Sequence, residues 1–396
     1  MTASARGAAT AHPLLLTLAL AVGGFAIGTT EFAAMSLLPF YARDFGIDEP
    51  TAGTAISAYA LGVCVGAPVI AVLAAKLSRR VLLIGLMTLF ALGNGLSALA
   101  PSYGVLVAFR FLSGLPHGAY FGVAALMAAS LVPPNRRAQA MGRVMLGLTI
   151  ATTVGVPLAN AIGQVAGWRS GFVIVAGLAA LTATLIAIYA PHDRPQAGAS
   201  PLRELGALGR RQVWLTLGIG AVGFGGIFAV YTYLGSTLIN YTHASPAALP
   251  AMLALFGLGM TVGTIVCARA ADRAMMPAIA ITLLVNAAAL MTFSVTAGSV
   301  WSMAPVVFVI GCGGGLSTML QARLMSVAAE AQTLAAALNH SAFNIANAIG
   351  PWLGGIAIAG GLGWPSIGWV GACLALGGLG LWAVTLADSR RNPAAA

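Results

Sequence analysis

Charged side chains are scarce in this sequence: they make up 7% of the 396 residues, and only nine residues are acidic. The hydrophobic share is 59% and the mean hydropathy is +0.93, which excludes an ordinary soluble globular domain. Apolar runs of about 20 residues recur from end to end, whereas a transmembrane barrel would show short alternating segments. The composition therefore predicts a polytopic α-helical membrane protein.

Several chemical motifs are missing as well. The spacings of the four cysteines fit no zinc or redox site. The sequence has no Walker loop, no HExxH pair and no nucleophile elbow, so it indicates neither ATP use nor hydrolysis. We expect no cofactor, no metal and no enzymatic activity. Glycine is abundant instead, at 50 residues, which in a membrane protein indicates close helix packing.

The basic residues give a net charge of +10, yet their positions argue against nucleic-acid binding. With the N-terminus taken as cytoplasmic, all 19 Lys and Arg residues except Arg43, Arg110 and Arg169 fall on that side of the membrane. This is the positive-inside pattern of a multi-pass protein. It predicts that both termini lie in the cytoplasm.

Twelve apolar spans can be placed, each long enough to cross a hydrocarbon core of about 30 Å. They lie at 14–40, 51–77, 81–100, 103–131, 138–166, 170–190, 213–240, 247–271, 277–297, 300–325, 334–360 and 365–386. The longest polar connection contains prolines and glycines and lies in the middle of the chain. We therefore predict a six-helix bundle at 1–191, a cytoplasmic linker at 192–212 and a second six-helix bundle at 213–396.

The two halves share a short repeat. Residues 61–66 read LGVCVG and residues 258–263 read LGMTVG, an offset of 197. A basic residue, Lys76 or Arg273, follows each motif at the same distance. Two repeated halves with a site between them near the midplane are a transporter architecture.

Four stretches resemble signatures of the major facilitator superfamily, and the resemblance covers essentially the whole chain. They are 28–39 in the first span, 71–80 at the end of the second span and in the loop that follows it, 110–118 in the fourth, and 155–158 in the fifth with 167–169 just after it. Within the superfamily, the chain is most similar to the bacterial drug:proton antiporter-1 group, near the arabinose-efflux and chloramphenicol-efflux permeases. The resemblance implies a monomer in the bacterial inner membrane, with twelve transmembrane helices in two pseudo-repeated bundles. It also implies multidrug or other small-molecule efflux in exchange for protons.

The same resemblance marks residues that take part in conformational change. They are Lys76, Arg79, Arg80, Gly155 and Pro157. The loop signature usually has an aspartate where this chain has Ala75, whereas Asp272 and Arg273 keep an acid and a base in the second half. We therefore expect a one-sided charge latch at the cytoplasmic face.

Glu31 is the only acidic residue well inside a span, and Arg110 is the only arginine there. An intramembrane charge costs about 2.5–3.5 kcal/mol on insertion scales, so each residue is a functional candidate. The two lie at similar depth, and we expect them to interact, with Glu31 carrying the coupled proton. A static structural pair, or an arginine that reaches the headgroups, is the alternative. His117 shares a helix face with Arg110 and is either a proton relay or a donor to a backbone carbonyl.

Five further residues are candidates for lining the substrate path: Asn160, Tyr231, Tyr233, His340 and Asn344. Interhelical hydrogen bonds or core packing would explain the same side chains, because polar groups in hydrocarbon need partners. The expected partners are a small-molecule substrate, protons and the lipid bilayer. Drug-like molecules, sugars and nucleosides all fit an apolar lining with scattered amides and hydroxyls. A transport-inactive receptor or sensor on the same scaffold is the alternative from another class.

Overall fold

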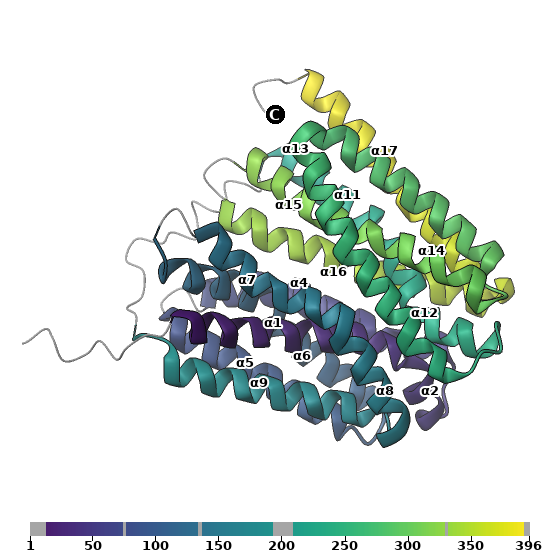
Figure 1. Cartoon of the computed structure of the whole chain (residues 1–396), viewed down its shortest axis with the longest axis horizontal. Helices are drawn as coiled ribbons and strands as arrows, with labels where there is room; N and C mark the ends of the chain where they lie inside the picture. Colours follow the sequence, from purple (N-terminus) through teal and green to yellow (C-terminus); the bar gives the residue numbers. More distant parts are fainter. Residues whose placement is uncertain (1–12, 74–76, 134–136, 193–208, 329–331, 392–396) are drawn as a thin grey trace, which may run out of the picture.

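The computed structural model describes residues 13–73, 77–133, 137–192, 209–328 and 332–391, and its regular structure is helical (Figure 1). The helices of the first half are α1 (Pro13–Ser36), α2 (Leu38–Phe45), α3 (Glu49–Ala52), α4 (Thr54–Leu73), α5 (Arg79–Ala98), α6 (Tyr103–Ser130), α7 (Arg137–Ile150), α8 (Val156–Ala166) and α9 (Arg169–Tyr189). Those of the second half are α11 (Arg211–Gly223), α12 (Gly225–Asn240), α13 (Leu249–Thr296), α14 (Val300–Cys312), α15 (Leu316–Val327), α16 (Gln332–Ala357) and α17 (Ser366–Arg391).

Among the described residues, eleven helical stretches are long and apolar enough to cross a membrane. The longest, Pro246–Thr296, has 51 residues and as a single rod would measure about 75 Å, far more than one bilayer core. Ala274 breaks it with non-helical backbone angles (φ −160°, ψ 83°), so α13 supplies two crossings. The predicted all-α fold with twelve transmembrane helices is confirmed.

Several predicted spans are divided, among them the first, the fifth, the seventh and the tenth. The first ends at Ser36 because Leu37 leaves the helix and Pro39, which lacks an N–H, starts the separate helix α2. The seventh is divided at Phe224, which lies between two glycines. The last span instead runs on from the predicted Leu386 to Arg391.

The repeated glycine motif packs in the same way in both halves. A methyl group on Gly62 of α4 would lie only 2.2 Å from the carbonyl oxygen of Phe111 in α6. A methyl group on Gly259 of α13 would lie 2.2 Å from the carbonyl oxygen of Phe308 in α14. The two pairs are related by the offset of 197, so the repeat reflects one helix contact used twice. Only glycine allows these backbones to approach so closely.

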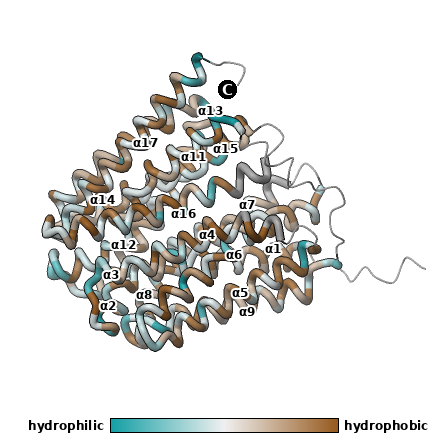
Figure 2. The backbone as a smooth tube through the Cα atoms, turned by 180° about the vertical axis from the view of Figure 1, so that it is seen from behind, coloured by the Kyte–Doolittle hydropathy of each residue, from teal (hydrophilic) through white to brown (hydrophobic). Residues whose placement is uncertain are grey.

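The helices form two groups that meet along a long interface. Figure 1 shows the purple-to-teal helices of the first half beside the green-to-yellow helices of the second, and in Figure 2 most of the backbone of both groups has the colours of hydrophobic residues. Between the groups, α4 packs on α16, and α13 packs on α8. Toward the end where α1 begins and α17 ends, α17 slopes away from α9 (Figure 1). We call the other end of the bundle, where α2 and α8 lie, the opposite face (Figure 1). The boundaries 1–191, 192–212 and 213–396 stay a prediction, and most of the linker lies outside the described residues.

Candidate functional site

Arg110 is buried in the middle of α6, with 1% of its surface exposed. Its Nη1 donates to Thr30 Oγ1 at 3.2 Å and lies 3.5 Å from Ser113 Oγ. Its guanidinium carbon lies 4.3 Å from the centre of the Tyr59 ring. The positive charge is therefore held by hydroxyl groups and an aromatic face. The interpretation in which Arg110 reaches the lipid headgroups is wrong, because the side chain points into the bundle.

Glu31 is buried in α1 and faces the other half of the protein. Its Oε1 accepts a hydrogen bond of 3.2 Å from Asn347 Nδ2 in α16. Among the described residues, no ion pair joins Glu31 to Arg110, so the interaction that we expect between them is not a direct contact in this conformation. Arg110 is bonded to Thr30 instead, and consecutive residues of a helix point in different directions. Glu31 thus connects the two halves, while its neighbour anchors the arginine.

His117 lies two turns beyond Arg110 and takes part in an aromatic cluster. Its Nδ1 is 2.9 Å from the Tyr59 hydroxyl, so its observed partner is a side chain. The His117 ring lies 5.4 Å from Phe121 and 6.4 Å from His340 of the other half. Phe121 and His340 are stacked at 5.4 Å with nearly parallel planes. Tyr59 therefore links Arg110 to His117, and the two histidines face each other across the interface.

Several buried polar atoms near Glu31 have no hydrogen-bond partner among the described residues. They include Tyr231 Oη, Asn344 Oδ1 and Asn347 Oδ1. The Tyr231 ring packs between Phe32, at 5.2 Å, and Phe256, at 4.4 Å. Buried polar atoms normally find partners, and those that do not call for water, an ion or a ligand. This part of the interface combines packed aromatic rings with a few polar atoms that have no partner, and both kinds of group can contact a small molecule.

Two predicted lining residues are occupied by contacts within the protein. Asn160 Nδ2 donates to the backbone oxygen of Ser36 at 2.9 Å, and Asn160 Oδ1 accepts from Gln164 at 2.8 Å. The Tyr233 hydroxyl donates to the backbone oxygen of Pro351 at 3.0 Å. In this conformation Asn160 joins α8 to α1 and Tyr233 joins α12 to α16, as the alternative interpretation expects.

The fifth-span motif coincides with a change in helix geometry. Ala151–Gly155 forms a π-helical turn between α7 and α8, and Pro157 lies at the start of α8. A methyl group on Gly155 would lie 2.5 Å from Thr29 Oγ1 in α1. Such turns interrupt helices at functional sites, and this one places α1 and the fifth span in close contact.

The predicted charge latch is only partly visible. Lys76 and Ala75 lie outside the described residues. Arg80 donates to a backbone carbonyl and to an imidazole at the end of α9. Asp272 and Arg273 are exposed at the bend of α13, where Arg273 Nη1 donates to the backbone oxygen of Arg269 at 3.3 Å. The one-sided latch stays a prediction.

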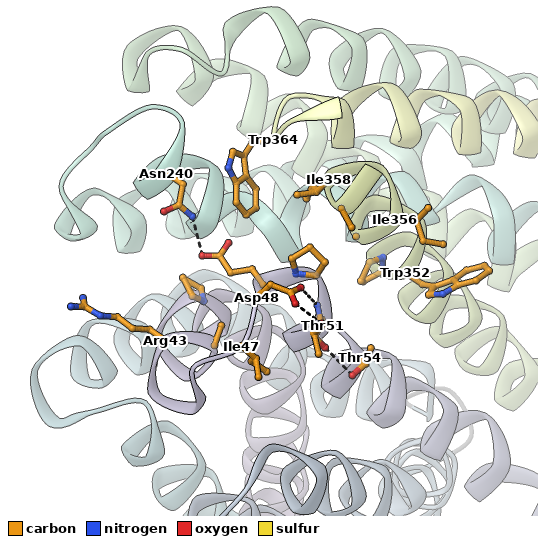
Figure 3. Close-up of a pocket in the computed structure, with 18 of the residues that line it drawn as sticks. Arg43, Ile47, Asp48, Thr51, Thr54, Asn240, Trp352, Ile356, Ile358 and Trp364 are labelled. Carbon is orange, nitrogen blue, oxygen red and sulfur yellow. Dashed lines mark hydrogen bonds between the residues drawn. The ribbon is translucent and has the colours of Figure 1, made fainter. Parts of the chain in front are cut away.

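A large cavity lies at the opposite face, away from Glu31, Arg110 and His117. Its volume is about 1120 Å³, and its walls come from α2, α3, α4, α12 and α16 (Figure 3). Two of the residues that line it come from different halves and are hydrogen-bonded: Asn240 Nδ2 donates to Glu49 Oε1 at 2.9 Å. Methyl groups on Gly53 and Gly355, which line the cavity, would lie 2.6 and 2.7 Å from the Tyr233 hydroxyl. The halves therefore meet closely around Tyr233, which lies between this cavity and the buried groups around Glu31. We call those buried groups the buried site.

The opposite face is also held together within the first half. Asp44 of α2 accepts hydrogen bonds from Arg169 and from Trp168 Nε1, the latter at 3.0 Å. The hydrogen bond from Arg169, followed by that from Trp168, holds the pKa of Asp44 below its usual range. Trp168 and Arg169 thus connect the start of α9 to α2, the helix that follows α1.

Comparison with known proteins identifies the family. The profile of the Major Facilitator Superfamily matches residues 20–336. The chain belongs to the major facilitator superfamily. It is 40% identical to "Inner membrane transport protein YdhP" of Escherichia coli (strain K12) over 385 residues, which cover 96% of this chain and 97% of the relative. It is 36% identical to the "Chloramphenicol resistance protein" of Streptomyces lividans over 347 residues, covering 86% and 88%.

A solved structure of the same architecture supports the fold. A bacterial homologue of the human lysosomal transporter Spinster superposes with a TM-score of 0.68 at 18% identity, covering 96% of both chains. As a major facilitator, the protein is a multi-pass membrane transporter rather than an enzyme. The resemblance drawn from the four signature stretches is confirmed.

Two residues of this major facilitator site were not among the predicted ones. Tyr59, which contacts both Arg110 and His117, sits in an apolar span with no distinguishing pattern. Asn347, the partner of Glu31, follows His340 by seven residues and Asn344 by three, so helical spacing places all three on one face. That shared face was the available signal for Asn347. Which face meets Glu31 depends on how α16 docks on the first half.

Proposed function

We propose that this protein is a proton-coupled antiporter that exports small organic or amphipathic molecules from the bacterial cytoplasm by alternating access. The observation that carries the proposal is the hydrogen bond between Glu31 and Asn347. It joins a buried carboxyl group of the first half to an amide of the second, at the interface that must open and close.

Protonation of Glu31 is linked to this interface by simple electrostatics. A carboxylate accepts a charge-assisted hydrogen bond from the Asn347 amide, and protonation replaces it with a weaker neutral bond. Separation of α1 from α16 replaces this bond with hydration of the carboxyl group, so the charged and the protonated forms of Glu31 favour the contact to different degrees. The proton and the contact between the halves therefore bias the same two-state equilibrium, which is what coupled transport requires.

His117 and His340 extend the site from Arg110 along the interface. The Tyr59 hydroxyl bonded to His117, and the position of His340 across the interface, provide groups that can pass a proton. We assign them the role of a relay between Glu31 and water.

The character of the buried site supports an amphipathic substrate. Phe32, Phe256 and Tyr231 supply apolar surface, and the free oxygens of Asn344 and Asn347 supply a few hydrogen-bond acceptors. The name of the chloramphenicol resistance relative supports the same class of solute. A sugar or nucleoside exporter would need more polar groups aimed into the site.

A flux screen tests the function. The purified protein is reconstituted into liposomes, and candidate solutes, including chloramphenicol-like drugs and simple sugars, are offered under an imposed pH gradient. We expect uphill accumulation of at least one amphipathic solute that collapses with a protonophore. Binding without net flux of any solute would instead favour a receptor.

The orientation in the membrane is a separate prediction. In a background with the native cysteines replaced, Ala247→Cys on the opposite face should react with an impermeant thiol reagent added outside intact cells. Ser326→Cys, near the end of α15, should react only after the membrane is permeabilised. Both residues are exposed in the structure. The expectation rests on the positive-inside pattern, and the reversed labelling would overturn it.

A further inference from the structure

A shallow groove on the lipid-facing surface of α13 combines two arginines with an apolar floor. Its volume is about 410 Å³, and it follows the bend at Ala274. It is lined by Val266, Arg269, Ala270, Arg273, Ala274, Pro277, Ala278 and Ile281.

The two ends of the groove have different chemistry. Val266 and Ile281 are 57% and 61% exposed, and in a transmembrane helix such exposed aliphatic side chains face lipid tails. Arg269 and Arg273 lie four residues apart, so they project from one face of the helix at the end of the span. Hydrocarbon and two positive charges thus meet within one groove, at the level of the headgroups.

The arginines are available to an external anion. Within the described part of the chain, the Arg269 guanidinium forms no hydrogen bond or ion pair, and Arg273 donates only one hydrogen bond, to a backbone oxygen. Guanidinium groups bind phosphate oxygens through paired N–H donors. The bend at Ala274 and Pro277 opens the helix surface beside them, because Ala274 is non-helical and Pro277 has no N–H.

We propose that this groove binds an anionic phospholipid, with its phosphate on Arg269 and Arg273 and an acyl chain along Val266 and Ile281. Basic pockets beside transmembrane helices recognise anionic headgroups in this way. The lipid lies at the junction of the eighth and ninth spans and stabilises the bend there. A soluble phosphate compound would use only the arginines and would leave the apolar floor uncovered.

The test uses the full-length protein in detergent, titrated with phosphatidylglycerol or with phosphatidylcholine of the same acyl chains. Binding is followed by native mass spectrometry and by the shift in melting temperature. We expect phosphatidylglycerol to bind more tightly and to raise the melting temperature. Arg269→Gln with Arg273→Gln should weaken its binding about thirtyfold, since each basic residue near an anionic headgroup contributes about fivefold. Arg269→Gln alone should lose about fivefold.

The matched control is Arg390→Gln with Arg391→Gln. These two exposed residues end α17 outside the groove, and their replacement removes the same charge. This control should bind phosphatidylglycerol like the parent. If both double variants lose the same affinity for phosphatidylglycerol, the effect comes from general surface charge and the proposed site is wrong. The proposed site is also wrong if the groove variant keeps the full affinity of the parent. Binding of glycerol 3-phosphate as tight as that of the lipid would show a free-anion site and overturn the lipid assignment.

Discussion

Replacement of Glu31 by glutamine should abolish uphill export driven by a pH gradient. Glutamine keeps the size of the side chain and can still accept the hydrogen bond from Asn347, but it cannot bind or release a proton. Exchange of substrate for substrate needs no net proton movement and should survive in part. The measurement is solute flux in proteoliposomes under an imposed pH gradient, with substrate exchange recorded on the same preparation.

The matched control is Glu49→Gln at the opposite face, which makes the same chemical change. Glu49 also bonds to the other half through Asn240, but it lines the cavity at the opposite face and lies away from Arg110 and His117. This variant should keep pH-driven export. Undiminished uphill transport by Glu31→Gln would remove Glu31 as the proton carrier and leave His117 and His340 as the candidates.

Arg110→Ala should destabilise the protein more than any other single charge removal. It deletes a buried cation with a hydrogen bond to Thr30 and a contact on the Tyr59 ring, together worth about 3–5 kcal/mol. Arg110→Lys should recover only part of this, because an ammonium group cannot stack as a flat plane on Tyr59. The measurement is the thermal unfolding midpoint and the yield of monodisperse protein in detergent.

Arg43→Ala provides the comparison, because Arg43 is exposed beside the cavity at the opposite face and its removal should leave the unfolding midpoint unchanged. Glu31→Gln added to Arg110→Ala should restore part of the lost stability if the arginine acts on Glu31 through its charge. If the double variant recovers none of the lost stability, the role of Arg110 is packing on Tyr59. An Arg110→Ala variant that melts with the parent would contradict the anchoring role altogether.

The fold was predictable because each span carries its own signal. Twenty apolar residues must cross the bilayer as a helix wherever they stand in the chain, and the positions of Gly62 and Gly259 marked a helix contact that both halves use. The span ends were less predictable. Hydropathy continues past Ser36 to Phe40, whereas the helix stops where Leu37 and Pro39 change the backbone.

The sequence identified the charged residues of the site but not the residues that they contact. Glu31 and Arg110 could be identified because a charged side chain within a membrane span is costly and is usually kept for a function. Their partners, Asn347 and Tyr59, come from spans that are neighbours only in three dimensions, so no spacing in the sequence pairs them. The asymmetry of the halves adds to this. At the offset of 197, Glu31 corresponds to Phe228 and Arg110 to Val307, so the internal repeat carries no second copy of the pair.

The most direct test of coupling is the movement of protons caused by the substrate itself. Liposomes holding the protein and a pH-sensitive dye are prepared without a pH gradient, and a transported solute is then applied as an outward or an inward gradient. Proton antiport predicts a pH change inside the liposomes whose sign reverses with the direction of the solute gradient and which Glu31→Gln eliminates. Solute flux of the same size with no pH change, or an unchanged signal in Glu31→Gln, would contradict it.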